Sequence, residues 1–392
     1  MESPSLTKTG LTQRPHYAAL DGFRGLLALF VAVYHTIWLS YPNSSAFLNN
    51  GAVIIDLFFA FSGFLMFSLY AETLQREGAV RDFMVRRFAR LMPMHLFMLG
   101  AFVAFALARL LAHEIGLASH EAGEVLPFQP GAVESWRNLL AHLTLTHASG
   151  GADQLAFNPP SWTVGAEFWT YALFAVVAAA LGRRAWSGWG VWAMIAVITA
   201  IYACLFALKP SMDITHDLGW VRCVAGFLVG GLAWRIRDAE GFRVGRPALV
   251  EWATVIGATL FTILCAGKGQ FLVGPVLLLF VVVFTQDRGP VSRLLSARPF
   301  PFLARISYSV YLSHVLIAIA FDIAAGQTVG AVWPEWRVHE GFGTLLLVPY
   351  LAVVIGVSAL TYRYVEVPGG RWLKRVLSAQ PQRTVDALPA AE

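Results

Sequence analysis

The sequence predicts an all-α protein, a polytopic membrane helix bundle of about ten transmembrane helices, and three observations support this prediction. Hydrophobic residues make up 57% of the 392 residues and charged residues only 14%, a balance that is not typical of a water-soluble protein of this length. Apolar runs of roughly 20 residues, the length that crosses the hydrocarbon core of a bilayer, recur along the chain. Basic residues collect in alternate connections between these runs.

Ten runs are predicted to span the membrane. In chain order they are residues 20–40, 51–71, 91–113, 161–181, 189–208, 217–235, 247–266, 270–286, 303–325 and 342–364. The seventh and eighth are separated only by a short turn around Lys268, so a re-entrant hairpin is an alternative there. The chain shows no internal repeat.

The distribution of Lys and Arg predicts that both termini are cytoplasmic. In that orientation the outer connections hold only Arg137, Lys209, Lys268 and Arg337. We expect a cytoplasmic N-terminal segment without a cleaved signal peptide, one membrane domain with a long external loop, and a cytoplasmic, partly disordered tail. The boundaries are 1–18, 19–368 with the loop at 114–160, and 369–392.

Cysteine usage and net charge limit the class of ligand. The three cysteines lie in or beside apolar runs, with no CxxC pair and no histidine cluster at zinc spacing, so we predict neither a disulfide framework nor a metal site. The net charge of +5 suits anionic lipid headgroups or a cytosolic anionic ligand. It gives no indication of nucleic-acid binding.

The first run, LDGFRGLLALFVAVYHTIWL, carries ionisable residues that are costly in a bilayer. Arg24 and His35 are eleven residues apart, which places them on nearly the same face of a helix. The predicted orientation puts Arg24 near the cytoplasmic end and His35 in the outer half of the membrane. As structural alternatives, Arg24 snorkels or pairs with Asp21, and a neutral His35 is hydrogen-bonded within the bundle.

The next two motifs carry a buried acid and an arginine pair. VIIDLFFAFSGFLM places Asp56 inside the second span, where it either orients a histidine or makes a structural polar contact, and Ser62-Gly63 permits close helix approach. In VRRFARLMPMHLF, Arg87 and Arg90 share a helical face and suit phosphate oxygens. The alternative is a cluster that contacts lipid phosphates.

Two later motifs add polar residues to apolar helices. In SWTVGAEFWTYALF, Glu167 and Tyr171 share a face near the outer surface. The Glu167 carboxylate could hold an imidazole or receive a sugar hydroxyl, or it could form a structural ion pair with Arg222. In ISYSVYLSHVLI, Tyr311 and His314 continue one polar stripe, for which packing between helices is the alternative.

In this order the motifs resemble acyltransferase family 3, integral-membrane enzymes that include O-acetylases of bacterial polysaccharides and Nod factors and acylases of macrolides. LDGFRG followed by VYH carries the family's first-helix signature, a basic residue and a histidine separated by ten residues. The late histidine is preceded by Ser313, where family members often have an aromatic residue. The resemblance implies an enzyme of the bacterial inner membrane that uses acyl-CoA, and above all acetyl-CoA, to modify a hydroxyl of a glycan or glycolipid.

The resemblance and the spacings together assign three roles. They make His35 the catalytic base, assisted by Glu167 or Asp56; they make Arg24, Arg87 and Arg90 the acyl-CoA ligands; and they assign Ser161, Trp162, Tyr171, Tyr311 and His314 to substrate binding. A different class stays open, a ten-helix secondary transporter or flippase with the buried charges as a proton or substrate path.

Overall fold

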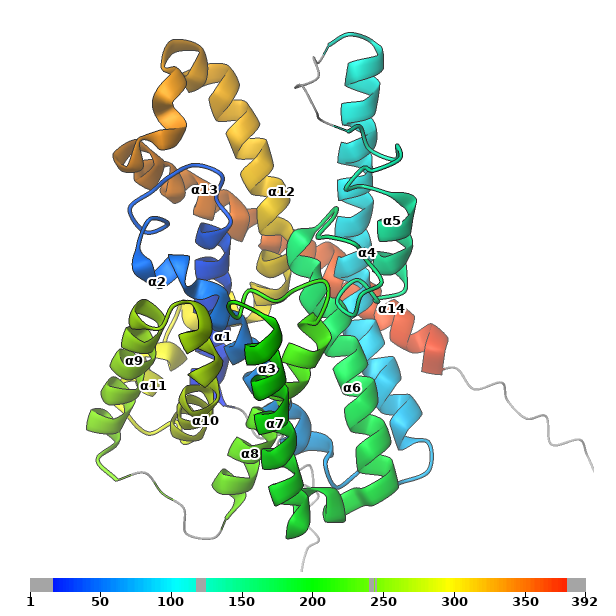
Figure 1. Ribbon diagram of the computed structural model, residues 1–392, viewed down its shortest axis with the longest axis vertical. Helices are drawn as coiled ribbons and strands as arrows, with labels where there is room; N and C mark the ends of the chain where they lie inside the picture. Colours follow the sequence, from blue (N-terminus) through cyan, green and yellow to red (C-terminus); the bar gives the residue numbers. More distant parts are fainter. Residues whose placement is uncertain (1–16, 118–124, 240–242, 244, 379–392) are drawn as a thin grey trace, which may run out of the picture.

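The computed structural model describes residues 17–117, 125–239, 243 and 245–378, and no β-strand occurs among them (Figure 1). The α-helices of the described chain are α1 (Ala18–Tyr34), α2 (Ala46–Asn49), α3 (Ile54–Tyr70), α4 (Ala79–Glu114), α5 (Trp136–Leu143), α6 (Trp162–Leu181), α7 (Trp189–Leu208), α8 (Gly219–Asp238), α9 (Pro247–Leu264), α10 (Val273–Phe284), α11 (Pro290–Ser296), α12 (Phe300–Val332), α13 (Glu340–Thr361) and α14 (Val367–Ser378).

The predicted fold class, an all-α polytopic membrane bundle, is confirmed. Each of the ten predicted spans overlaps a helix. Within the described residues, eight helical stretches are long and apolar enough to cross a membrane. The other two predicted spans do not meet this description: α1 is short, with 17 residues, and α8 contains three arginines.

Two helix boundaries differ from the prediction. α4 begins at Ala79 rather than 91, after Gly78 in a left-handed conformation (φ 75°), so the arginine pair lies inside the helix. α1 ends at Tyr34 rather than 40 because side chains bind its terminal carbonyls. Thr36 Oγ1 donates to the Val33 oxygen at 3.0 Å. The N-terminal end of α1 is fixed as well, since the Asp287 carboxylate accepts from the amides of residues 18 and 19 at 3.0 and 2.8 Å.

Glycines let the central helices approach each other closely. α3 packs along α8 (Figure 1), and a Cβ atom on Gly63 would overlap the Phe227 carbonyl oxygen. The predicted close approach at this glycine is therefore confirmed. On the opposite helix, a Cβ on Gly230 would overlap the Ala60 carbonyl oxygen and lie 2.5 Å from the Phe64 backbone nitrogen.

The connection before α6 enters the bundle instead of staying at the surface. Asn158 is 2% exposed and Ser161 is fully buried. The Asn158 side chain donates to the Leu312 carbonyl oxygen in the middle of α12 at 3.0 Å. Because the connection reaches this depth, the first turns of α6 lie inside the protein.

Three stacked histidines fasten the same connection to α4. His142 on α5 lies 4.2 Å from His147 and 6.4 Å from His95 of α4, measured between ring centroids. His95 Nε2 donates to the His142 carbonyl oxygen at 3.0 Å. All three side chains are buried.

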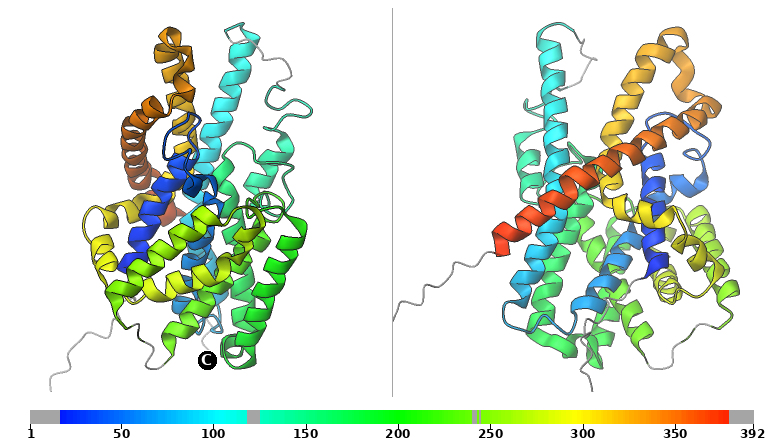
Figure 2. Two further views of the ribbon diagram at one scale, coloured as in Figure 1. Left: turned by 60° about the vertical axis from the view of Figure 1, so that its left-hand side comes forward. Right: turned by 180° about the vertical axis from the view of Figure 1, so that it is seen from behind.

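The C-terminal end continues as a helix beyond the predicted membrane domain. α13 passes through a π-helical turn (Tyr362–Glu366) into α14, which crosses α4 in the right-hand view of Figure 2. Gly369 and Gly370 allow this crossing, because Cβ atoms there would approach Pro93 and Ala89 within 2.7 and 2.9 Å. The predicted tail at 369–392 therefore begins as helix, and its residues 379–392 lie outside the described part.

The α3–α8 contact predicts that Gly230→Ala lowers the stability. We expect a loss of about 1–3 kcal/mol, the usual cost of overpacking, read as a lower melting temperature of the detergent-solubilised protein. Gly257→Ala on α9 is the matched control, since no atom lies within 4 Å of its added Cβ, and it should be neutral or stabilising by up to about 1 kcal/mol. Equal melting temperatures for the two variants would contradict the close contact.

The histidine stack predicts acid sensitivity. Burial, followed by the proximity of His147, lowers the pKa of His142 to about 3, against about 6.5 in an unfolded chain. The unfolded state then binds more protons between these values, so the free energy of unfolding falls as the pH falls below about 6.5. For His142 alone the loss from pH 7 to pH 4.5 is about 2–3 kcal/mol. Melting temperatures across this range should fall less steeply in His142→Phe; an unchanged slope would contradict the prediction.

Candidate active site

Two cavities inside the bundle collect the residues that the sequence singles out. The arginine cavity has a volume of about 240 Å³, and its lining includes Arg24, Arg87, Arg90, Glu167 and Tyr171. The histidine cavity has a volume of about 260 Å³, and its lining includes Tyr34, His35, Trp162, Asp213 and Arg222. Ile55 and Tyr311 line both cavities. The two chambers are therefore neighbours that share two wall residues.

α1 contributes to both cavities through one face. Arg24 lines the arginine cavity and His35, at the end of the helix, lines the histidine cavity. This agrees with the eleven-residue spacing, which places the two side chains on one side of the helix. One face of α1 therefore borders both cavities, with Arg24 in the first and His35 in the second.

His35 contacts another histidine rather than a carboxylate. Its Nδ1 lies 2.9 Å from the Val31 carbonyl oxygen and 3.2 Å from Nε2 of His314. Nδ1 of His314 lies 3.1 Å from the Val310 carbonyl oxygen. Carbonyl oxygens only accept, so these hydrogen bonds assign the proton of each neutral ring to Nδ1. His35 Nδ1–H then donates to both Val31 and His314, and Nε2 of His35 keeps its lone pair.

His314 itself is fully buried in α12 and is not part of either cavity lining. The Tyr350 hydroxyl donates to its backbone oxygen at 3.2 Å and to the Ala32 oxygen at 3.1 Å, which ties α13 to α12 and α1. The structure thus places His314, predicted to bind substrate, behind His35. The short distance between the two rings was not predicted from the sequence.

The three arginines predicted to bind acyl-CoA differ in their partners. Arg24 forms an ion pair with Asp21 at 3.3 Å, so the pair considered as an alternative is present. Arg90 pairs with Glu366 of the π-helical turn. Arg87 has no carboxylate partner among the described residues, and its guanidinium lies 5.8 Å from the ring centroids of both Tyr70 and Phe83. It is the arginine of this cavity whose charge is not balanced by a direct ion pair.

Glu167 lies in the arginine cavity and not beside His35. The Tyr171 hydroxyl donates to Glu167 Oε2 at 3.1 Å and is 2.5 Å from the Ser62 hydroxyl. The sequence predicted Glu167 near the outer surface; in the structure the connection before α6 enters the bundle, and Glu167 lines the arginine cavity. Tyr171, predicted to bind substrate, lies in the same cavity as the three arginines predicted to bind acyl-CoA.

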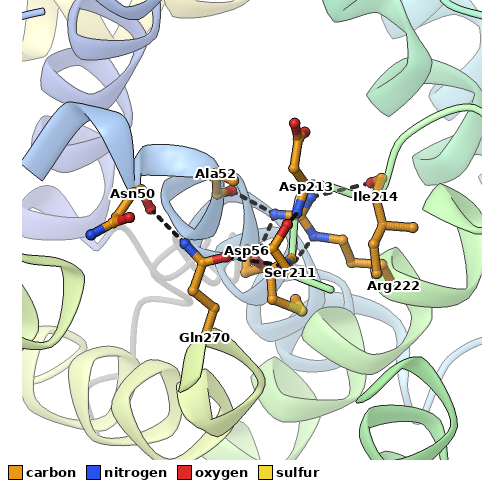
Figure 3. A network of polar contacts seen from close by, with 9 residues as sticks. Asn50, Ala52, Asp56, Ser211, Asp213, Ile214, Arg222 and Gln270 are labelled. Atoms are coloured by element: carbon orange, nitrogen blue, oxygen red, sulfur yellow. Dashed lines mark hydrogen bonds and ion pairs between the residues drawn. The ribbon is translucent and has the colours of Figure 1, made fainter. Parts of the chain in front are cut away.

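Asp56 is bound by Arg222, the arginine that the sequence had offered as an alternative partner for Glu167. Arg222 Nε and Nη2 donate to the two carboxylate oxygens at 3.1 and 2.8 Å (Figure 3). The side chains are 1% and 0% exposed, so this is a fully buried bidentate ion pair. Among the described residues, Asp56 makes no hydrogen bond with His35, and its predicted catalytic role remains a prediction.

The remaining predicted residues divide between packing and cavity walls. Ser161 is buried and donates to the Asn158 carbonyl oxygen at 2.7 Å, whereas Trp162 lines the histidine cavity and Tyr311 lines both. Sequence reasoning missed Asp213 as a wall residue. The only signal was an acid in a short outer connection, which is ordinary in a loop.

A family model and one known protein match the chain over most of its length. A family model described as an acyltransferase domain matches residues 17–363. The acyltransferase MdmB of Streptomyces mycarofaciens is 24% identical over 368 residues, which cover 86% of each chain. Protein 2 in the picA locus of Rhizobium radiobacter is 34% identical over 100 residues, which are 24% of this chain and 49%, about half, of that relative. No solved structure matches.

Proposed function

This chain belongs to the acyltransferase-domain family, and from that premise we propose that it transfers an acyl group, above all acetyl, from acyl-CoA to a hydroxyl of a glycan or glycolipid. The observation that carries the proposal is the pair of adjoining cavities with different chemistry, one lined by arginines and the other by His35. A donor in the first and an acceptor in the second would meet where Ile55 and Tyr311 line both. Membership of an enzyme family favours this function over the transporter alternative.

The arginine cavity is proposed as the donor site. Coenzyme A carries several phosphate groups, and guanidinium groups bind phosphate oxygens bidentately while staying charged. Arg87 is the first candidate because it makes no direct ion pair with a carboxylate among the described residues, although Glu167 lies in the same cavity. Arg24 and Arg90 extend the positive wall, each with part of its charge balanced by an acid.

His35 is proposed as the general base. Its Nδ1–H is held by Val31 and His314, which leaves Nε2 free to accept a proton. The acceptor oxygen attacks the thioester carbonyl carbon as Nε2 takes the hydroxyl proton. The carbon–sulfur bond then breaks, and the departing thiolate receives that proton from Nε2. Nε2 of His314 accepts from the imidazolium that forms, the role that a carboxylate was expected to have.

The membrane setting follows from the same assignment. We place this multi-pass protein in the bacterial inner membrane with both termini cytoplasmic, because the basic residues then lie inside. Arg87 and Arg90 belong to that cytoplasmic set, so acyl-CoA would reach the arginine cavity from the cytosol. The acceptor would reach His35 from the opposite leaflet or from outside.

The donor site predicts different outcomes for two adjacent arginines. Arg87→Ala should weaken acyl-CoA binding about tenfold or more, since one charge-assisted contact to phosphate is lost. Arg86→Ala is the matched control: Arg86 is the preceding residue on α4, its guanidinium also lies over Tyr70 at 5.5 Å, and it does not line the cavity. Isothermal titration with acetyl-CoA measures both. Equal affinities in the two variants would remove Arg87 from the donor site.

The general-base assignment predicts a loss of turnover without a loss of donor binding. His35→Ala should lower transfer from labelled acetyl-CoA at least ~10²-fold, the lower range for a general base. His314→Ala should cause a smaller loss, because it acts through His35. Binding of acetyl-CoA and the melting temperature serve as controls for folding. Wild-type transfer by a folded His35→Ala protein would disprove the proposed base.

A further inference from the structure

We propose that Asp213 forms an anionic subsite in the histidine cavity and selects hydroxylated acceptors that also carry a protonated amine, such as an amino sugar. The inference rests on the proposed function, because it takes the histidine cavity to be the acceptor site. It adds a chemical class to an acceptor that the family alone does not define. Three features of the structure support it.

The first feature is the charge balance of the cavity. Apart from His35, the charged residues in its lining are Asp213 and Arg222. Both oxygens of Asp56 bind Arg222, so this arginine is compensated within the protein. Asp213 is left as the uncompensated charge of the wall, and it favours a cation over a neutral or anionic group.

The second feature is the lack of a partner for Asp213. Other aspartates in or next to the predicted outer connections are paired: Asp153 with Arg137 at 2.6 Å, Asp322 with Arg337 at 2.7 Å, and Asp217 with Lys209. Among the described residues, the Asp213 carboxylate has no hydrogen bond or ion pair. Figure 3 shows it pointing away from the Arg222 guanidinium. Its acceptor capacity is therefore available to a ligand in the cavity.

The third feature is the fixed backbone on either side of Asp213. Met212 and Ile214 are 0% and 2% exposed, whereas Asp213 between them is exposed. The Met212 amide donates to Gln270 Oε1 at 3.0 Å, and Arg222 Nη1 donates to the Ile214 carbonyl oxygen at 3.2 Å. A residue held between two anchored neighbours loses little conformational freedom when it binds a ligand.

The rest of the cavity wall suits the sugar part of such an acceptor. Tyr34 and Trp162 present aromatic surface beside Asp213 and His35, and Trp162 is itself held over Arg222 at 5.6 Å. Aromatic faces pack against apolar faces of ligands and also attract ammonium groups. An acceptor with a hydroxyl at His35 and an ammonium at Asp213 would contact both of these lining residues.

The test compares two probes that differ only by the amine. Purified wild-type protein in nanodiscs is titrated with p-nitrophenyl β-D-glucosaminide and with p-nitrophenyl β-D-glucoside, at a pH where the amine is protonated. We expect the aminoglycoside to bind about tenfold more tightly, because an ammonium donates to the Asp213 carboxylate where the glucoside offers only a neutral hydroxyl. Asp213→Asn should abolish this preference and Asp213→Glu should keep most of it. Asp217→Asn, four residues further on and outside the cavity lining, should keep all of it.

Three results would overturn the inference: equal affinity of wild-type protein for the two probes, a preference that survives in Asp213→Asn, or no binding of the aminoglycoside. A parallel assay with labelled acetyl-CoA separates this inference from the proposed function. Absence of acyl-enzyme, thioester hydrolysis and acylated product in wild-type protein would refute the proposed function, while the binding preference still reports on Asp213. Transfer without an amine preference would refute only the subsite.

Discussion

The buried ion pair between Asp56 and Arg222 is the constraint on which the site depends. Removing one partner of such a pair typically costs about 3–5 kcal/mol, because the other charge is left uncompensated in a medium of low dielectric constant. Arg222 also donates to the carbonyl oxygens of Ala52 and Ile214, at 2.5 and 3.2 Å. One guanidinium therefore links α3, α8 and the connection before α8 through four hydrogen bonds within the protein.

This pair has electrostatic as well as mechanical consequences. Because Asp56 compensates Arg222, the histidine cavity is not made positive by the arginine in its wall. In the arginine cavity, acids balance Arg24 and Arg90, and Arg87 has no such partner among the described residues. The two chambers thus differ in the charge that they offer to a ligand, although they share Ile55 and Tyr311. This difference is the reason that we propose one cavity for a phosphate-bearing donor and the other for a hydroxylated acceptor.

α1 contributes one lining residue to each cavity, Arg24 and His35, and both of its ends are fixed. Asp287 accepts from its first amides, and its last carbonyls are bound by side chains that follow the helix. His35 stands at the helix end, where its ring is oriented by Val31 and by His314. These hydrogen bonds to Nδ1 determine which ring nitrogen carries the proton, and so which nitrogen can accept one.

The sequence by itself determined the helical membrane fold and the approximate position of every predicted span. Hydrophobicity and helix periodicity are local properties, and they are legible in 20 consecutive residues. It also placed Arg24 and His35 on one face, since that relation lies within one helix. Helix ends were less accurate, because short polar contacts and turns set them rather than hydrophobicity: α1 ends at Tyr34 where Thr36 binds a terminal carbonyl, and α4 begins directly after the left-handed Gly78.

Only the tertiary structure decided which polar residues became partners. Arg222 binds Asp56, 166 residues away in the chain, and not Glu167. His35 contacts His314 across 279 residues, and Glu167 lies in the arginine cavity because the connection before α6 enters the bundle. Spacing along one helix defines a face but contains no information on which other helix will cover it. That choice depends on close packing between helices. Here it is set by glycines such as Gly63 on α3 and Gly230 on α8, and by the buried Asp56–Arg222 pair that joins the same two helices.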